Sequence, residues 1–290
     1  MTVPSLSRSV FGHTFQNPIL LAAGTAGFGR ELEGVMDLDR LGGIVTKAVS
    51  LAPRAGNPSP RVAEFSGGMI NSVGLANPGL EMVRSRDLPW LAGRLTRARI
   101  IVNVVGFTFD EYAEVIGGLD GLEGIAAYEL NLSCPNTSAG GMEFGSDPEA
   151  VKRVMARCRP TTKRALIAKL SPALADIPTL ARAAVDAGAD GISVVNTMPG
   201  YLFEGTAPRL GNGNGGVSGP ALLPVGLLAV RKVKDCMPEV PVIGVGGVRS
   251  ARDVGQYLRA GASLVAIGTA QLADPRLPER IVRDLERQRG

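Results

Sequence analysis

The chain has 290 residues, of which 45% are hydrophobic and 20% are charged, a composition typical of a folded globular protein and not of a disordered one. The net charge is only +4, and acidic and basic residues are interleaved along the chain, which makes nucleic-acid binding a minority interpretation. No stretch approaches the roughly 20 apolar residues of a membrane helix, and the N-terminus has no signal-peptide pattern, so we expect a cytoplasmic protein without a membrane partner.

Short apolar runs alternate along the chain with stretches of helical spacing, a pattern typical of repeated βα units around a parallel sheet. Each apolar run is nearly continuous, as expected for strands that are buried on both faces. We predict eight strands, at residues 18–22, 43–47, 100–104, 128–132, 166–170, 191–195, 242–245 and 264–267.

Helical spacing is clearest at residues 147–157, 177–187 and 251–260, and Asp147 and Ser250 are suited to be N-caps. Eight βα units close into a barrel more naturally than into an open sheet. We therefore predict an α/β fold, a (β/α)8 TIM barrel. Because such barrels commonly reach about 250 residues as one unit, a single domain is expected.

Two connections are longer than a βα loop requires, residues 48–77 after the second strand and 196–219 after the sixth. We expect them to form lids or hairpins over one end of the barrel. Residues 211–216 of the second connection match G-x-G-x-x-G. A dinucleotide-binding fingerprint directly follows a strand and opens a helix, whereas this match lies within a loop, so we interpret it as a flexible, turn-rich stretch.

Polar residues follow or end most of the predicted strands. Ligands of barrel enzymes bind at the carboxyl ends of the strands, so these residues are candidates for one site. They are Thr46, Lys47, Asn103, Asn131, Cys134, Lys169, Asn196 and Thr197.

Glycines follow the last two predicted strands, at Gly246, Gly247 and Gly268. They would let backbone N–H groups approach a phosphate, although glycine also marks ordinary turns. Lys47 and Lys169 indicate negative charge in the site, because an unpaired buried ammonium is costly. An internal lysine–carboxylate pair is the alternative.

Cys134 stands where an apolar run stops at a rigid Cys-Pro step. A thiol held there can act as a base or nucleophile, and the alternative is a buried cysteine that acts as a small hydrophobe. The other cysteines, Cys158 and Cys236, lie far away in the sequence, so neither a zinc site nor an iron–sulfur cluster is expected from this chain alone. The single histidine, His13, excludes multi-histidine metal sites and excludes a Ser-His-Asp triad unless His13 itself is the base, so proton transfer is expected from another residue type.

Several segments match those of one enzyme family in order and spacing. On these segments the chain resembles a class 1 dihydroorotate dehydrogenase over nearly its whole length, and it is most similar to the catalytic subunit of the NAD-linked, two-subunit enzyme. The segments are residues 17–31, 43–47, 71–79, 131–136, 140–145, 216–220, 246–247 and 268–269.

The resemblance implies a single FMN-binding barrel domain, residues 1–290, that oxidises (S)-dihydroorotate to orotate in de novo pyrimidine (UMP) biosynthesis. Cys134 would be the catalytic base, and hydride would pass to N5 of FMN. FMN would contact Ala23, Lys47, Ala48, Asn103, Asn131, Lys169, Val195, Gly219, Gly246, Gly247, Gly268 and Thr269. Ala23 departs from relatives that have serine there, so only a backbone contact to the flavin would survive at this position.

The resemblance also implies how substrate is held. Asparagine amides both donate and accept hydrogen bonds, which suits the alternating C=O and N–H groups of a pyrimidine-dione ring, and Lys47 would meet the carboxylate. Substrate would contact Lys47, Asn71, Ser72, Val73, Gly74, Leu75, Asn131, Asn136, Asn196 and Thr197.

The electrons must leave through a partner. In the NAD-linked enzyme this would be a subunit with FAD and an iron–sulfur cluster, assembled on a catalytic homodimer as a heterotetramer, with NAD+ as the final acceptor. A one-subunit, fumarate-linked relative is an alternative. A flavin-dependent tRNA dihydrouridine synthase is another, favoured by the pI of about 9.1 but disfavoured because Asp284 and Glu286 interrupt the basic C-terminal tail. A non-catalytic flavin-binding scaffold is the third.

Overall fold

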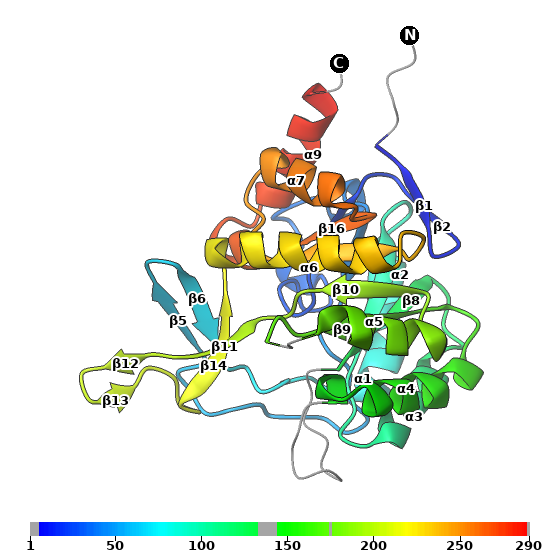
Figure 1. The fold of residues 1–290 in the computed structure, drawn as a ribbon, viewed down its shortest axis with the longest axis horizontal. Helices are drawn as coiled ribbons and strands as arrows, with labels where there is room; N and C mark the ends of the chain where they lie inside the picture. Colours follow the sequence, from blue (N-terminus) through cyan, green and yellow to red (C-terminus); the bar gives the residue numbers. More distant parts are fainter. Residues whose placement is uncertain (1–5, 133–143, 174–175, 289–290) are drawn as a thin grey trace.

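The computed structural model describes residues 6–132, 144–173 and 176–288, and its centre is a closed barrel of eight parallel strands (Figure 1). Neighbouring strands follow the chain order, and the last pairs with the first, so the predicted TIM barrel is confirmed. The barrel strands are β3 (Ile19–Leu21), β4 (Gly43–Val45), β7 (Arg99–Val104), β8 (Ile125–Asn131), β9 (Ala165–Leu170), β10 (Gly191–Val194), β15 (Val242–Val245) and β16 (Leu264–Ile267). All eight predicted strands are present, and β8 begins earlier than expected because Ala126 and Ala127 are buried in it.

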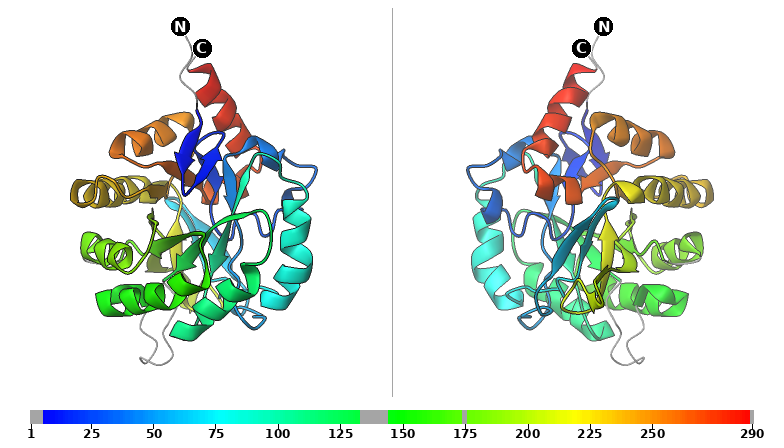
Figure 2. Two further views of the ribbon diagram at one scale, coloured as in Figure 1. Left: turned by 90° about the vertical axis from the view of Figure 1, so that its right-hand side faces the viewer. Right: turned by 90° about the vertical axis from the view of Figure 1, so that its left-hand side faces the viewer.

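Helices surround the strands (Figure 2). The three predicted helices are confirmed to within one residue at each end, and Asp147 and Ser250 cap theirs as expected by accepting backbone N–H groups. The helices are α1 (Leu80–Met82), α2 (Leu88–Ala92), α3 (Phe109–Leu119), α4 (Pro148–Cys158), α5 (Ile177–Asp186), α6 (Leu223–Cys236), α7 (Ala251–Ala260), α8 (Thr269–Ala273) and α9 (Leu277–Arg287). Short 3₁₀ turns lie at Arg30–Leu32, Leu38–Arg40, Phe144–Ser146, Arg159–Thr161 and Pro220–Leu222, and Val83–Asp87 is a π-helical turn. In the described part of the chain, every helix is too short or too polar to cross a bilayer.

The strands are apolar on both faces because each face packs against a different cluster. One cluster, which includes Leu20, Ile101 and Ile167, fills the barrel interior. A larger cluster fills the space between the strands and the helices. A hairpin of β1 (Arg8–Val10) and β2 (His13–Phe15) brings Phe15 against the interior cluster. It therefore closes the N-terminal end of the barrel and leaves the carboxyl ends of the strands for a ligand.

The two long connections contain hairpins, one of the two forms expected for them, and these hairpins pair with one another, which was not predicted. The first contains β5 (Val62–Phe65) and β6 (Gly68–Asn71). The second contains β11 (Met198–Tyr201), β12 (Phe203–Glu204), β13 (Ala207–Pro208) and β14 (Asn214–Ser218). Together they make an antiparallel sheet of order β11-β14-β6-β5 that projects on the left of Figure 1.

The glycine-rich stretch 211–216 is only partly a turn. From residue 214 onward it is strand β14, so the prediction of a flexible loop is wrong there. The physical reason is close strand packing, because a Cβ atom on Gly215 would lie 2.4 Å from the carbonyl oxygen of Asn71. The stretch opens a strand and not a helix, and the G-x-G-x-x-G match is therefore no dinucleotide-binding fingerprint.

Asp39 ties together two connections at the N-terminal end of the barrel. Its carboxylate accepts hydrogen bonds from the backbone N–H groups of Thr96, Arg97 and Ala98 and from the Thr96 hydroxyl. Burial raises the pKa of Asp39, but these hydrogen bonds outweigh burial and hold the pKa below its ordinary value. Such a group stabilises the fold above its unfolded pKa of about 3.9 and loses this contribution as pH falls through the folded value.

We expect Asp39→Asn to lower the free energy of unfolding at pH 7 by about 1–2 kcal/mol, because a neutral amide accepts these hydrogen bonds more weakly. The difference from wild type should shrink as pH falls below about 4. Urea unfolding at several pH values measures this. Asp235→Asn is the control, since Asp235 pairs with Arg231 on the exposed surface and its loss should cost little. Equal losses in both variants at pH 7 would contradict the role of Asp39.

Candidate active site

A buried polar network crosses three neighbouring strands near their carboxyl ends. Asn103 on β7 donates its Nδ2 hydrogen to Glu129 Oε1 on β8 at 2.8 Å. The same oxygen lies 3.4 Å from Lys169 Nζ on β9. All three residues are buried. Lys169 therefore has the internal carboxylate partner that was the alternative to a ligand anion, and Glu129 is a member of the site that the sequence did not indicate.

Two predicted substrate asparagines meet beside this network. Asn196 Nδ2 donates to Asn131 Oδ1 at 3.2 Å, and Asn196 Oδ1 accepts from the backbone N–H of Thr197 at 2.9 Å. The backbone carbonyl of Asn131 accepts from the Tyr112 hydroxyl at 2.8 Å. Asn131 is the register partner of Lys169 on the adjacent strand. The structure thus brings amides from the fourth and sixth barrel strands together next to a buried ammonium.

Lys47 is placed by its backbone at the end of β4. Its N–H donates to the carbonyl of Gly27 at 2.8 Å, and its carbonyl accepts from the Thr46 hydroxyl at 2.9 Å. Thr46 Oγ1 also accepts from the backbone N–H of Asn103 at 3.2 Å, which links Lys47 to the network. Unlike Lys169, Lys47 forms no ion pair with any residue in the described part of the chain.

The predicted substrate segment 71–75 packs against the second long connection. Asn71 Nδ2 donates to the carbonyl of Gly216 at 3.2 Å. Gly216 in turn lies against Thr197, because a Cβ atom on it would fall 2.0 Å from Thr197 Oγ1. Gly74 and Leu75 both have left-handed φ angles, of 71° and 57°. The pairing of the two hairpins thus brings Asn71 and Thr197 to the same end of the barrel.

The predicted phosphate site is a rim of backbone at the ends of β15 and β16. Gly246 and Gly247 have φ angles of 121° and 72°, which residues with side chains rarely adopt. A Cβ atom on Gly268 would lie 3.7 Å from the Cβ atom of Ala22, an ordinary van der Waals contact. Thr269 Oγ1 donates to Ser218 Oγ at 2.7 Å, which places Gly219 beside this rim.

Tyr257 on α7 contacts the backbone of this rim at the end of β15, a role that the sequence did not indicate. Its hydroxyl lies 3.0 Å from the carbonyl oxygen of Val245 and 2.8 Å from that of Gly246. Gly226 and Gly244 leave room for the side chain, since Cβ atoms there would lie 2.0 Å and 2.3 Å from Tyr257 atoms. The only trace of this arrangement in the sequence is the presence of Gly226 and Gly244, and their contact with Tyr257 becomes visible only in the fold.

Cys134 and Asn136 lie outside the described residues. The described ends beside them are held together, because the N–H of Gly145 donates to the carbonyl of Leu132 at 2.8 Å. Burial raises the pKa of the Cys158 thiol to about 12, which makes this thiol unreactive near neutral pH.

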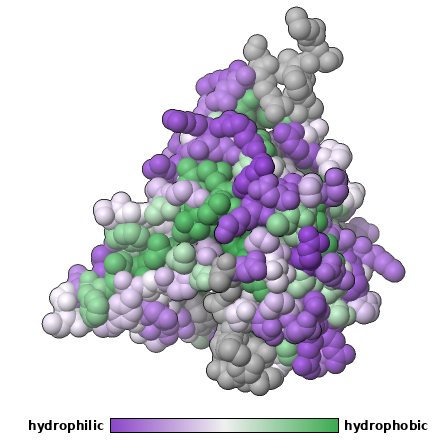
Figure 3. Space-filling view, in the orientation of Figure 1, coloured by the Kyte–Doolittle hydropathy of each residue, from purple (hydrophilic) through white to green (hydrophobic). Residues whose placement is uncertain are grey.

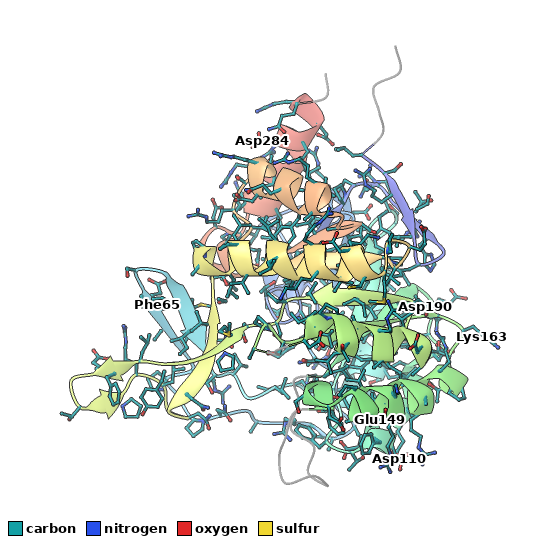
Figure 4. The ribbon with its side chains drawn as sticks, in the orientation of Figure 1. Phe65, Asp110, Glu149, Lys163, Asp190 and Asp284 are labelled. Carbon is teal, nitrogen blue, oxygen red and sulfur yellow. The ribbon has the colours of Figure 1, made fainter. Side chains whose placement is uncertain are left out.

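His13 belongs to the closed end of the barrel, and burial, followed by the charge of Arg99, lowers its pKa. Lys163 and Asp190 also lie at that end, whereas Phe65 lies in the projecting hairpin at the opposite end (Figure 4). A proton acceptor at the strand ends must therefore be a residue other than His13.

Two sequence comparisons with known proteins agree on the family. A sequence model of the family described as dihydroorotate dehydrogenase matches residues 5–288. A protein of Desulforudis audaxviator named "Dihydroorotate dehydrogenase B (NAD(+)), catalytic subunit" is 47% identical over 282 residues, 96% of this chain and 90% of that protein. A protein of the same name from Pelobacter propionicus is 44% identical over 286 residues, 98% of this chain and 93% of its own.

A comparison with solved structures concerns the fold. The crystal structure of DHODH from Eimeria tenella in complex with ferulenol has a TM-score of 0.82 with this chain, at 24% identity, and the match covers 97% of this chain and 83% of that one. At that identity the likeness concerns the fold alone, whereas the sequence matches concern the family. The chain belongs to the dihydroorotate dehydrogenase family.

Proposed function

We propose that this chain is the catalytic subunit of an NAD-linked dihydroorotate dehydrogenase that oxidises (S)-dihydroorotate to orotate with FMN, as a cytoplasmic step of pyrimidine biosynthesis. The observation that carries the proposal is the meeting of the Asn131 and Asn196 amides beside buried Lys169 at the open end of the barrel. Amides recognise the C=O and N–H groups of the ring, and lysine recognises negative charge. Family membership supports the same reaction.

The residues at the open end fit FMN. Gly246 and Gly247 have positive φ angles and no side chains, which would let backbone N–H groups approach a phosphate, and the ammonium of Lys169 suits an electron-rich pyrimidine edge. Ser193 pairs in register with Lys169, is fully buried, and its Oγ finds no hydrogen-bond partner among the described residues. Since buried hydroxyls are almost always paired, this oxygen is consistent with a polar ligand in the site.

The proposed reaction divides between two faces of the substrate. Lys47 would pair with the carboxylate, and Asn71, Asn131 and Asn196 would hold the ring by its amide groups. Cys134, as a thiolate, would take a proton from one ring carbon while the adjacent carbon loses hydride, and a C=C bond forms between them. When bound, FMN would accept that hydride at N5.

The test is to purify the chain, load it with FMN, and add dihydroorotate without oxygen while the flavin absorbance is followed. Rapid bleaching is the expected result. A yellow protein that does not bleach with dihydroorotate would favour the RNA-modifying or scaffold alternatives. A chain that binds no FMN, even when produced with a partner subunit, would overturn the proposal.

Tyr257→Phe should weaken FMN binding about 5- to 10-fold, because Val245 and Gly246 lose the hydroxyl that contacts their carbonyl groups, a change of about 1 kcal/mol. Fluorescence titration of the apoprotein with FMN measures this. Tyr128→Phe is the matched control, since Tyr128 is equally buried. Its hydroxyl donates to Asp120 Oδ1, over a distance of 3.3 Å, and this hydrogen bond does not involve the ends of β15 and β16. Unchanged FMN affinity in Tyr257→Phe would contradict the role of this hydroxyl.

We further propose that electrons leave through a partner subunit that carries FAD and an iron–sulfur cluster, on a homodimer of this chain. The relatives are named as catalytic subunits, which supports a partner. Apolar surface also gathers on the face seen in Figure 3, from the projecting hairpin toward α6. Among the large apolar side chains, Phe203 on β12, Leu228 on α6 and Leu272 on α8 are 66%, 56% and 48% exposed. Exposed apolar surface of this kind marks interaction sites.

Co-purification of the chain with a flavin and iron–sulfur subunit, and reduction of NAD+ only by the complex, is the expected result. Turnover of the isolated chain with fumarate would instead identify it as a one-subunit enzyme.

A further inference from the structure

Glu129 is a buried carboxylate with two buried partners. Its side chain is 2% exposed and that of Lys169 is 8% exposed. Asp87, another buried carboxylate, is held by Arg30 and Arg86, whose side chains are 43% and 54% exposed and reach the solvent. An ion pair with both members buried adds little net stability, since desolvation of the two charges offsets their attraction. Stability alone therefore gives no reason for this pair at the ligand end of the barrel.

The chemistry of the carboxylate fixes the orientation of Asn103. A carboxylate only accepts hydrogen bonds, so the amide nitrogen of Asn103 must face Glu129 and its Oδ1 must point elsewhere. The carboxylate also holds Lys169 Nζ on the side of β8 and neutralises part of its charge. Glu129 thereby determines two properties of the site: which amide atom Asn103 presents to a ligand, and how much positive charge Lys169 presents to it.

We propose that Glu129 is a positioning residue that tunes the reduction potential of the flavin through Lys169. This inference depends on the proposed function, because it requires FMN at the carboxyl ends of β7, β8 and β9. The reduced flavin is electron-rich at its pyrimidine edge, and a nearby cation stabilises it. Glu129 weakens this effect by sharing the charge of Lys169 and so keeps the flavin able to pass its electrons on.

The substitution Glu129→Gln keeps the size and an acceptor oxygen but removes the negative charge. We expect the equilibrium of two-electron flavin reduction to shift at least tenfold toward the reduced form, about 30 mV for a two-electron couple. Dye-coupled redox titration of the FMN-loaded protein without substrate measures this shift. The affinity for sulfite, which adds to flavin N5 and leaves negative charge on the pyrimidine ring, should tighten in parallel.

A double-substitution cycle separates action through Lys169 from a direct effect of Glu129. Lys169→Gln should shift the equilibrium toward the oxidised form. In that background the cation through which Glu129 would act is gone, whereas a direct effect of the carboxylate on the flavin would remain. We therefore expect Glu129→Gln to shift the equilibrium less than threefold when Lys169 is absent. An equal tenfold shift in both backgrounds would overturn action through Lys169.

Two further variants are controls that distinguish a specific effect of Glu129 from a general loss of structure. Glu129→Asp keeps the charge but withdraws it by one methylene from Lys169, so we expect a shift of threefold or more in the same direction. Asp87→Asn is the matched control for removing a buried, cation-paired carboxylate, and it should leave the equilibrium within twofold of wild type. If Glu129→Gln and Glu129→Asp both fold, as judged by circular dichroism, but bind no FMN, Glu129 is a structural partner and the proposal is overturned.

The outcomes distinguish this inference from the proposed function. Wild-type protein that binds FMN and is bleached by dihydroorotate, with Glu129→Gln within twofold of its reduction equilibrium, overturns only the role of Glu129. Wild-type protein that binds no FMN overturns both.

Discussion

Replacing Cys134 by alanine is expected to slow reduction of the bound flavin by dihydroorotate by about 10²- to 10⁴-fold, the usual contribution of a positioned general base. FMN should stay bound, because the predicted cofactor contacts come from other residues. Cys134→Ser should recover only part of the rate, since a hydroxyl is far less acidic than a thiol. Anaerobic rapid mixing, with flavin absorbance as the signal, measures the single reductive step without the acceptor.

The other cysteines supply matched controls for this experiment. Cys236→Ala removes an exposed thiol, and Cys158→Ala removes a buried thiol whose raised pKa makes it unreactive. Both variants should reduce flavin at the wild-type rate, although Cys158→Ala should lose some stability through its cavity. If Cys134→Ala loses FMN to the same extent as activity, the thiol has a structural role and another residue must be the base.

The pH profile of flavin reduction should report the same group. An ordinary thiol has a pKa of about 8.5 and is mostly protonated near pH 7, so the rate should rise toward alkaline pH as the thiolate forms. His13 cannot account for such a rise, because it lies at the closed end of the barrel and its pKa is lowered. A flat profile in wild-type protein would contradict a thiolate base, and the rise should be absent in Cys134→Ala.

The barrel could be predicted because its strands carry a local signal. Successive residues of a strand point to opposite faces: Leu20 belongs to the interior cluster and Ile19 to the outer one. Because both faces are apolar, each strand appears in the sequence as a continuous apolar run. Among the described polar residues that end these runs, Asn131, Lys169 and Asn196 lie at one end of the barrel. The position where each strand ends can be predicted because the apolar run stops there. The closure of the barrel then brings Asn131, Lys169 and Asn196 together.

Other features depend on pairing between distant segments and have no local signal. Asn71 and Gly216, 145 residues apart, are joined only because β6 and β14 pair. Glu129 looked like one polar residue inside an apolar strand, and its meaning depends on Asn103 and Lys169 on the neighbouring strands. From the sequence, Lys169 was a candidate site residue with an internal carboxylate partner as the alternative, but nothing indicated that Glu129 is this partner.

That difference between the two lysines leads to the second large effect. Lys47 forms no ion pair with a described residue, whereas Lys169 pairs with Glu129, so Lys47 is the cation that a substrate carboxylate should meet. We expect Lys47→Met to lower kcat/KM for dihydroorotate about 10- to 150-fold, since a hydrogen bond to a charged group contributes about 1.5–3 kcal/mol. Lys163→Met, at the opposite end of the barrel, should have no effect (Figure 4).

A neutral substrate separates this role from a general loss of structure or of FMN. Wild-type protein should use the carboxamide analogue of dihydroorotate poorly, because Lys47 would face no charge. Lys47→Met should therefore lose little activity with the amide and most of its activity with the acid, which removes the preference between them. Steady-state kinetics on both compounds measure the preference directly. An equal loss with both would mean that Lys47 acts on the flavin, and the substrate carboxylate would then need another partner at the open end of the barrel.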